Sequence, residues 1–420
     1  MLLRRDFALL FLVLFVVAAG NTALQSVLPT IGRAIGMPDV LVAVIFSFSA
    51  LLWVFSAPYW AEESDRRGRK ALVMLGMAGY AVSKLICAIV ILLGLLGVLS
   101  PVATFVLFAL GRALFGLFGS ASNPAAQAYV AARTSPAERT RALAALSSAF
   151  GLGTIVGPAV APFLVMPAVT LAGPMFAFAA IALLTLWGVW RYLPGKRAAT
   201  REPMYAEASV EPTIGAAGHA GAARGRQRLS WRDPRILPFA LFGLMIGNAQ
   251  AASGQTLGFL IIDKLGLPPV VAQASIGLAM MAGAVATLLA QWALIPMFDM
   301  QPRQLMRWGA GLAALGSTML ALAGDLHAIA IAFALASLGY GFARPGFNAG
   351  ASLAVGPEDQ GAAAGTITAV NGAAFVVAPA LGIALYQIAQ PLPYLISAIV
   401  LIAMLVYAVR NPLLARGLDG

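Results

Sequence analysis

The stretch Ser64-Asp-Arg-Arg-Gly-Arg-Lys70, SDRRGRK, carries charge on five of its seven side chains, in a chain that is 60% hydrophobic and only 10% charged. Long apolar runs lie on both sides of it, over residues 40–60 and 71–97. Apolar runs of about 20 residues have the length of membrane-spanning helices. The stretch therefore indicates a short polar connection between two spans.

The whole chain has the composition of an integral membrane protein, with 420 residues and a mean hydropathy of +0.87. Backbone polar groups in lipid are satisfied only in helices or in a closed barrel, and the apolar runs here are continuous rather than alternating. The fold class predicted is an all-α membrane protein. The N-terminal apolar run is too long for a signal peptide and is expected to be an uncleaved first helix.

Several classes of function are excluded by residues that the chain lacks. Its single cysteine, Cys87, excludes an intrachain disulfide and a thiolate metal cluster. Its two histidines are far apart, and neither HExxH nor GxxxxGK[ST] occurs, which argues against a zinc hydrolase and an ATP-driven pump. We expect no enzyme activity, no metal and no cofactor.

Hydropathy predicts twelve spans, six in each half of the chain. They are expected near residues 6–28, 40–61, 71–95, 103–131, 140–165, 171–192, 235–262, 270–298, 305–324, 327–354, 361–388 and 391–410.

The basic residues predict the orientation of these spans. Most of the 27 fall in loops on the side of the two termini, only Arg33 and Lys264 fall on the opposite side, and Lys84, Arg112 and Arg344 fall inside spans. Basic residues collect in cytoplasmic loops, so both termini are predicted to be cytoplasmic, in a bacterial-type inner membrane. The net charge of +11 is thereby explained without nucleic acid.

The chain divides into two repeated halves, residues 1–192 and 234–420. Residues 193–233 are rich in Gly, Ala and Arg and are predicted to be a flexible cytoplasmic linker. Turn and kink residues recur in the same order in the two halves: Gly20-Asn21 with Gly247-Asn248, Gly36-x-Pro38 with Gly266-x-Pro268, Pro124 with Pro345, and Pro158 with Pro379. Parallel repeats of this kind build one class of transporter around a central site.

The charged stretch carries a family resemblance. Residues 61–70, AEESDRRGRK, match the pattern G-x-x-x-D-R-x-G-R-[KR] at every position except the leading glycine. In this loop the pattern resembles the major facilitator superfamily, and the chain as a whole is similar to its 12-span drug:proton antiporters of the multidrug and tetracycline type.

The resemblance implies that the loop is a cytoplasmic gating motif that holds the two halves together, formed by Asp65, Arg66, Gly68, Arg69 and Lys70. Its expected partners are Arg133 or Arg139 and the start of the eleventh span near Gln360-Gly361. Independently of the family, a glycine permits the positive φ of a tight turn, and a carboxylate can pair with arginine or cap a helix. A solvated basic loop is the alternative, and it leaves Asp65 and Gly68 unexplained.

The fifth span resembles a second motif of the antiporters, G-x₈-G-x₃-G-P-x₂-G-G. Gly153, Gly157 and Pro158 match it, whereas Ala144, Ala161 and Pro162 replace expected glycines. Glycine and proline kink a helix and allow close packing. The partial match favours an exporter over an importer; an ordinary kink would also suit a uniporter or a symporter.

Polar residues inside the spans are the candidates for a central cavity. Arg112 and Gly116 resemble the fourth-span motif of drug antiporters, and Arg344 lies on the matching tenth span. A guanidinium in hydrocarbon is costly, so these arginines are expected to face a wet cavity; a seam of small residues with a snorkelling arginine is the alternative. The predicted cavity residues are Asn21, Gln25, Arg112, Asn123, Gln127, Asn248, Gln250, Gln255, Arg344, Asn348 and Asn371. Lys84, on the peripheral third span, is expected to snorkel or pack.

The predicted function is alternating-access efflux of small organic molecules, coupled to proton entry, by a monomer. No Asp or Glu falls inside a span, so Asp6, at the inner mouth of the first span, is the candidate for proton coupling. Two arginines without a carboxylate predict neutral or anionic, partly apolar substrates. A sugar or metabolite facilitator, a flippase for a lipid-linked substrate and a transport-inactive sensor are the alternatives.

Overall fold

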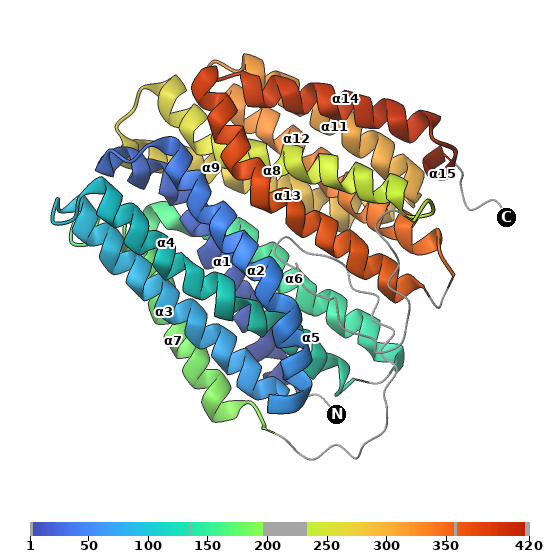
Figure 1. Cartoon of the computed structure of the whole chain (residues 1–420), viewed down its shortest axis with the longest axis horizontal. Coiled ribbons are helices and arrows are strands. Elements are labelled where there is room, and N and C mark those ends of the chain that lie inside the picture. Colours follow the sequence, from blue (N-terminus) through green and yellow to red (C-terminus); the bar gives the residue numbers. More distant parts are fainter. Residues whose placement is uncertain (1–2, 135, 196–232, 357–358, 416–420) are drawn as a thin grey trace.

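The computed structural model describes residues 3–134, 136–195, 233–356 and 359–415, and at some helical positions within these ranges only the backbone is described. Figure 1 shows two bundles of helices side by side, one from the first half of the chain, coloured blue to green, and one from the second half, coloured yellow to red. The predicted linker falls mostly on residues 196–232, which lie outside the described ranges.

The first half consists of α1 Arg4–Ile35, α2 Asp39–Arg67, α3 Arg69–Leu95, α4 Pro101–Phe118, η1 Gly119–Ala121, α5 Ser122–Ala131, α6 Pro136–Val160, η2 Ala161–Leu164 and α7 Gly173–Tyr192. The second half consists of α8 Leu237–Leu265, α9 Pro269–Leu288, the π-turn η3 Leu289–Leu294, α10 Ile295–Phe298, α11 Pro302–Leu322, α12 Leu326–Leu353, α13 Gln360–Ile388, α14 Leu392–Arg410 and α15 Pro412–Ala415. We call the end of the bundle at which α1 begins the inner end, and the opposite end the outer end.

Two of the predicted spans are interrupted rather than continuous. The fourth breaks at the 3₁₀ turn of residues 119–121 into α4 and α5, and the eighth contains the π-turn of residues 289–294. A proline follows each irregular turn, Pro124 and Pro296, and a proline cannot donate to the carbonyl four residues before it. The predicted spans near residues 103–131 and 270–298 are each one apolar helical segment, Pro101–Ala131 and Pro269–Phe298, with an irregular turn inside it.

The described residues contain nine helices that are long and apolar enough to cross a membrane. Shorter apolar stretches, Ser148–Leu164 and Gly372–Ile388, lie in α6 and α13. Residues of both stretches line the cavity described below. The multi-pass helical fold therefore agrees with the prediction, and the number twelve stays a prediction.

The repeat is visible in how equivalent helices end. Gly36 ends α1 with φ of 78°, and Gly266 ends α8 with φ of 59°. Both are left-handed conformations that favour glycine, and in each half the next helix begins shortly after. Pro158 and Pro379, another matched pair, both lie inside helices, α6 and α13.

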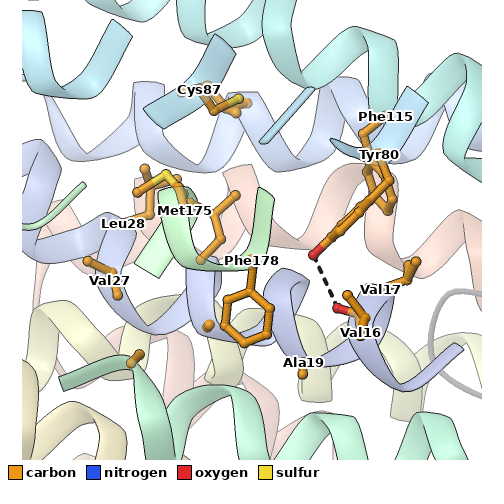
Figure 2. Packing of buried hydrophobic residues seen from close by; sticks show 14 of the residues in the cluster. Val16, Val17, Ala19, Val27, Leu28, Tyr80, Cys87, Phe115, Met175 and Phe178 are labelled. Carbon is orange, nitrogen blue, oxygen red and sulfur yellow. Dashed lines mark hydrogen bonds between the residues drawn. The ribbon is translucent and has the colours of Figure 1, made fainter. Parts of the chain in front are cut away.

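Aromatic and aliphatic side chains fill the interior of the first half. Figure 2 shows Tyr80 of α3 donating to the carbonyl oxygen of Val16 in α1, at 3.2 Å. The Tyr80 ring meets that of Phe115 from α4 edge-on, with the ring centroids 5.6 Å apart. These contacts fix α3 and α4 against α1, close to Arg112.

At the inner end of the second half, an arginine ties two helices together. Arg235 binds Asp233 at 2.9 Å and Asp359 at 3.2 Å, which joins the residues before α8 to those before α13. Hydrogen bonds from Arg235 hold the pKa of Asp233 below its usual range.

Candidate functional site

The charged loop lies at the inner end, between α2 and α3. Gly68 precedes α3 with φ of 91°, which confirms the positive φ expected there. Lys70 Nζ donates to the Trp190 carbonyl of α7 at 2.8 Å, and Arg67 Nε donates to Glu63 at 2.7 Å. The turn is therefore held to its own half of the molecule.

The pairing predicted for the gating motif stays a prediction. The side chains of Asp65, Arg139 and Gln360 lie outside the described part of the chain. Arg133, another expected partner, lies over the Tyr129 ring, with its guanidinium carbon 3.6 Å from the ring centroid.

Gly153 and Gly157 are places where α6 touches the backbone of α1. A Cβ at Gly153 would lie 2.6 Å from the Phe15 carbonyl oxygen, and one at Gly157 would overlap the Ala19 carbonyl oxygen and the Thr22 hydroxyl. Both glycines are thus needed for this packing. The next residue, Pro158, lies beside α9 of the other half, since a Cβ at Gly277 would come within 2.7 Å of its carbonyl oxygen.

A cavity of about 280 Å³ lies between the two halves. Residues of α1, α2, α4, α5 and α6 form one wall, and residues of α8, α9, α12 and α13 form the other. Seven of the predicted cavity residues line it: Asn21, Gln25, Arg112, Asn123, Gln250, Gln255 and Arg344. Their role in binding a substrate stays a prediction.

The four other predicted residues are not among those found to line the cavity. Gln127 donates to the side-chain oxygen of Asn123 at 3.0 Å, and Asn248 donates to the Leu244 carbonyl of its own helix at 2.7 Å. Asn348 has a buried side-chain oxygen without a hydrogen-bond partner among the described residues. The side chain of Asn371 lies outside the described part of the chain.

Each half contributes one arginine to the cavity, and each arginine binds an amide of its own half. Arg112 Nη2 of α4 donates to Asn21 Oδ1 of α1 at 3.1 Å, and Arg344 Nη2 of α12 donates to Gln250 Oε1 of α8 at 3.2 Å. The repeat had paired Asn21 with Asn248, whereas the structure uses Gln250, two positions later. The cavity therefore has a cation on each wall.

Lys84 packs inside the first half. It is 1% exposed, and its Nζ donates to the Gly20 carbonyl of α1 at 2.7 Å. The expectation that it packs rather than lines the cavity agrees with this position.

The cavity is closed at its outer end by contacts between the halves. Arg33 of α1 binds Asp39 of α2 at 2.6 Å and Asp263 of α8 at 3.2 Å. Tyr386 of α13 donates to Asp263 at 2.8 Å. The sequence had placed these charges near the outer ends, but nothing in it indicated that they meet.

A second set of cross-half contacts lies just inside the first. Gln273 of α9 donates to Ser26 at 3.3 Å, and its side-chain oxygen accepts from Thr30 at 3.2 Å, both on α1. Along α1 the cavity-lining residues come first and are followed by Ser26, Thr30 and Arg33. Along α9, which runs in the opposite direction, Gln273 comes before the cavity-lining residues. The cavity thus lies on the inner side of both sets of contacts.

Several cavity residues were missed because they are aromatic. Phe46 and Trp53 on α2, Phe115 on α4, Phe333 on α12 and Phe375 on α13 all line the cavity. In a chain with this many apolar residues, sequence alone does not separate an aromatic side chain that faces a cavity from one that faces lipid.

Asp6, the candidate for proton coupling, lies outside the cavity wall near the start of α1. It is 3% exposed, its Oδ1 has no hydrogen bond among the described residues, and Arg5 Nε lies 3.8 Å away. In the described part of the chain, this buried carboxylate therefore has one ion pair, and that pair is weak.

Comparison with known proteins gives a consistent picture. A sequence profile described as Major Facilitator Superfamily matches residues 10–294 and 272–417. The tetracycline resistance protein, class B, of Escherichia coli is 32% identical over 149 residues, which cover 35% of this chain and 34% of that protein. Multidrug resistance protein 2 of Bacillus subtilis (strain 168) is 27% identical over 179 residues, 42% of this chain and 41% of that protein. The matches thus span well under half of these relatives.

Solved structures with the same fold match over nearly the whole chain. The human organic anion transporter MFSD10 has a TM-score of 0.64 and 19% identity, and covers 96% of this chain and 99% of its own. A bacterial homolog of the human lysosomal transporter Spinster, in an inward-facing and occupied conformation, has a TM-score of 0.70 and 11% identity, and covers 99% and 98%. At these identities the likeness shows the fold.

Proposed function

The chain belongs to the Major Facilitator Superfamily, and from that premise we propose that it exports small organic molecules by alternating access, coupled to proton entry. The inner end faces the cytoplasm of a bacterial-type inner membrane, as the distribution of basic residues predicts. The resistance proteins among its relatives support export as the direction of transport.

The observation that carries this proposal is the closed outer end above a central cavity. Arg33, Asp263 and Gln273 hold the two halves together there, and the cavity begins one helical turn or more further in. A molecule from the cytoplasm would enter such a cavity from the inner end. Export then requires these contacts to break while contacts at the inner end form.

The proposal is tested by efflux of a compound panel from a bacterial host that lacks its own pumps. We expect expression of the protein to lower the accumulation of some compounds, and a proton uncoupler to abolish that effect. Efflux that persists after uncoupling would show that transport does not depend on the proton gradient, as expected of a facilitator. No effect on any compound would contradict export.

We propose Asp6 for proton coupling, since its one ion pair among the described residues, with Arg5 at 3.8 Å, is weak, and such a buried carboxylate can exchange a proton without breaking a strong ion pair. Asp6→Asn is expected to reduce gradient-driven efflux to the level of uncoupled wild type, while exchange of labelled for unlabelled substrate continues. The matched control is Asp325→Asn, because Asp325 caps α12 at the outer end. Wild-type efflux by Asp6→Asn would rule out this assignment.

The gating motif gives a second prediction. If Asp65 latches the halves at the inner end in the outward-facing state, Asp65→Asn should insert normally into the membrane and transport at a reduced rate. Glu63→Gln is the control, because Glu63 lies on the same helix end and pairs with Arg66 and Arg67. Equal transport rates in Asp65→Asn and wild type would refute the latch.

A further inference from the structure

Arg112 is a buried cation whose hydrogen bonding is incomplete. It is 2% exposed and lines the cavity, and its Nε and Nη1 have no hydrogen-bond partner among the described residues. Among the described residues, its guanidinium makes one hydrogen bond, to the neutral amide of Asn21. A buried charge without a counter-charge costs several kcal/mol, so the site as it stands is incomplete.

The rest of the cavity adds positive charge. Arg344 faces it from the second half, and no Asp or Glu is among the described residues that line it. Electrostatics therefore favour an anion in this cavity and oppose a cation.

The wall next to Arg112 is aromatic. Its guanidinium carbon lies 4.7 Å from the ring centroid of Phe115 and 5.5 Å from that of Phe46. The ring of Trp53 lies beside Phe115, with the centroids 5.2 Å apart. A guanidinium next to aromatic rings presents hydrogen-bond donors and an apolar surface to one ligand.

Resting on the proposed function, we propose that the transported substrate is an amphipathic organic anion. Its carboxylate or sulfonate accepts hydrogen bonds from the free nitrogens of Arg112, and its apolar part packs on Phe46, Trp53 and Phe115. Arg344 attracts the anion from the opposite wall. The ligand thus supplies the negative charge that Arg112 lacks.

The charge of the substrate has a consequence for its energetics. Moving one elementary charge through 100 mV changes its free energy by ~2.3 kcal/mol, which is about tenfold in the equilibrium ratio for each ~60 mV. A cell interior is negative, so the membrane potential drives an anion outward. An anion therefore gains a driving force for export that an uncharged molecule of the same size lacks, whatever the number of protons exchanged.

Proteoliposomes with purified full-length protein test this proposal with three probes of one size: coumarin-3-carboxylate, its uncharged carboxamide and a trimethylammonium coumarin. Potassium and valinomycin set an inside-positive potential, which drives anion uptake. We expect carboxylate uptake in protein-containing but not in protein-free liposomes. Its accumulation should respond to the potential more steeply than that of the carboxamide, by about tenfold for each ~60 mV.

The Arg112→Gln variant should take up the carboxylate at least about tenfold less well, because a charged hydrogen-bond donor is lost. Arg410→Gln, at the exposed end of α14, is the matched control and should behave as wild type. If Arg112→Gln does not fold, titration calorimetry on the wild type replaces it, and the carboxylate should bind at least about tenfold more tightly than the carboxamide.

The outcomes separate this inference from the proposed function. The anion site is refuted if the protein prefers the carboxamide or the ammonium probe, or if a folded Arg112→Gln variant takes up the carboxylate as well as the wild type. Neither result would contradict the proposed export function. The same two conclusions follow if no probe moves while compounds of the efflux panel are exported. If neither the probes nor the panel compounds are transported, the proposed function itself fails.

Discussion

Replacing Asp263 with asparagine is expected to open the outer end of the bundle. Asp263 forms the ion pair between Arg33 and the second half, and it also accepts a hydrogen bond from Tyr386. Without its charge, Arg33 keeps its ion pair with Asp39 on its own half, and across the halves it keeps only the weaker contact with the Phe259 ring, 5.6 Å from the ring centroid. The side chains of Arg33 and Asp263 are 34% and 20% exposed, so solvent weakens the pair, and we expect a shift of about 1 kcal/mol toward the open state, roughly fivefold in population.

Spin labels at the outer end would measure this shift. Cys87 is the only cysteine of the chain, so Cys87→Ser gives a background for labels at Val98 and Leu322, exposed residues at the outer ends of the two halves. The distance between the two labels, measured by pulsed electron–electron double resonance, should be longer in Asp263→Asn than in the wild type. Asp325→Asn removes an outer carboxylate that does not join the halves and should leave the distances unchanged. Distances in Asp263→Asn that match those of the wild type would show that this ion pair does not close the outer end.

Adding one methyl group at Gly157 should destabilise the protein strongly. The Cβ of alanine would overlap the Ala19 carbonyl oxygen and the Thr22 hydroxyl of α1, and a backbone carbonyl cannot move aside as a side chain can. Inserting a methyl into such a contact costs about 1–3 kcal/mol, or more if the helix cannot shift. Gly157→Ala should therefore melt at a lower temperature in detergent and should also lose transport.

Gly151→Ala, six residues earlier on the same helix, is the matched control. Its Cβ would meet only the end of the Leu288 side chain, at 3.1 Å, and that side chain can rotate. Thermal unfolding followed by size-exclusion chromatography distinguishes the two variants. If they melt at the same temperature, Gly157 serves only as a kink and its close approach to α1 is unimportant.

Much of the fold follows from simple features of the sequence. The apolar runs predicted a helical multi-pass protein, and the charged loop with its repeat predicted the family, which the profile match confirms. These features are local or recur at fixed spacing, so they can be recognised without knowledge of tertiary contacts. Gly68 shows this best, because its place in a tight turn required the positive φ that it has.

The cavity was predicted less completely, for a physical reason that Gln127 makes clear. Both Gln127 and Arg112 were predicted to line the cavity, and in a continuous helix their spacing of fifteen residues would put them on one face. The 3₁₀ turn at residues 119–121 turns about 120° per residue instead of about 100°, which shifts the direction of the residues after it; Asn123 still lines the cavity, whereas Gln127, one further turn along, does not. Gln127 binds Asn123 instead of lining the cavity.

The outer closure could not be predicted because it depends on which helices meet. Arg33 was counted as a charge on the far side of the membrane, and Asp263 as an acid near a helix end. Their pairing joins residues 230 positions apart. No sequence-spacing rule predicts a contact between residues so far apart. The position of these contacts on the outer side of the cavity can be seen only when the helices are arranged in three dimensions.

The central claim is that the outer contacts must break in every transport cycle, and a reversible cross-link tests it most directly. In the Cys87→Ser background, Thr30→Cys and Gln273→Cys place two thiols at a cross-half contact. A short bifunctional methanethiosulfonate should then stop transport of a panel compound in proteoliposomes, reducing agent should restore it, and each single-cysteine variant should be unaffected. Undiminished transport with the outer end cross-linked would contradict alternating access through this cavity.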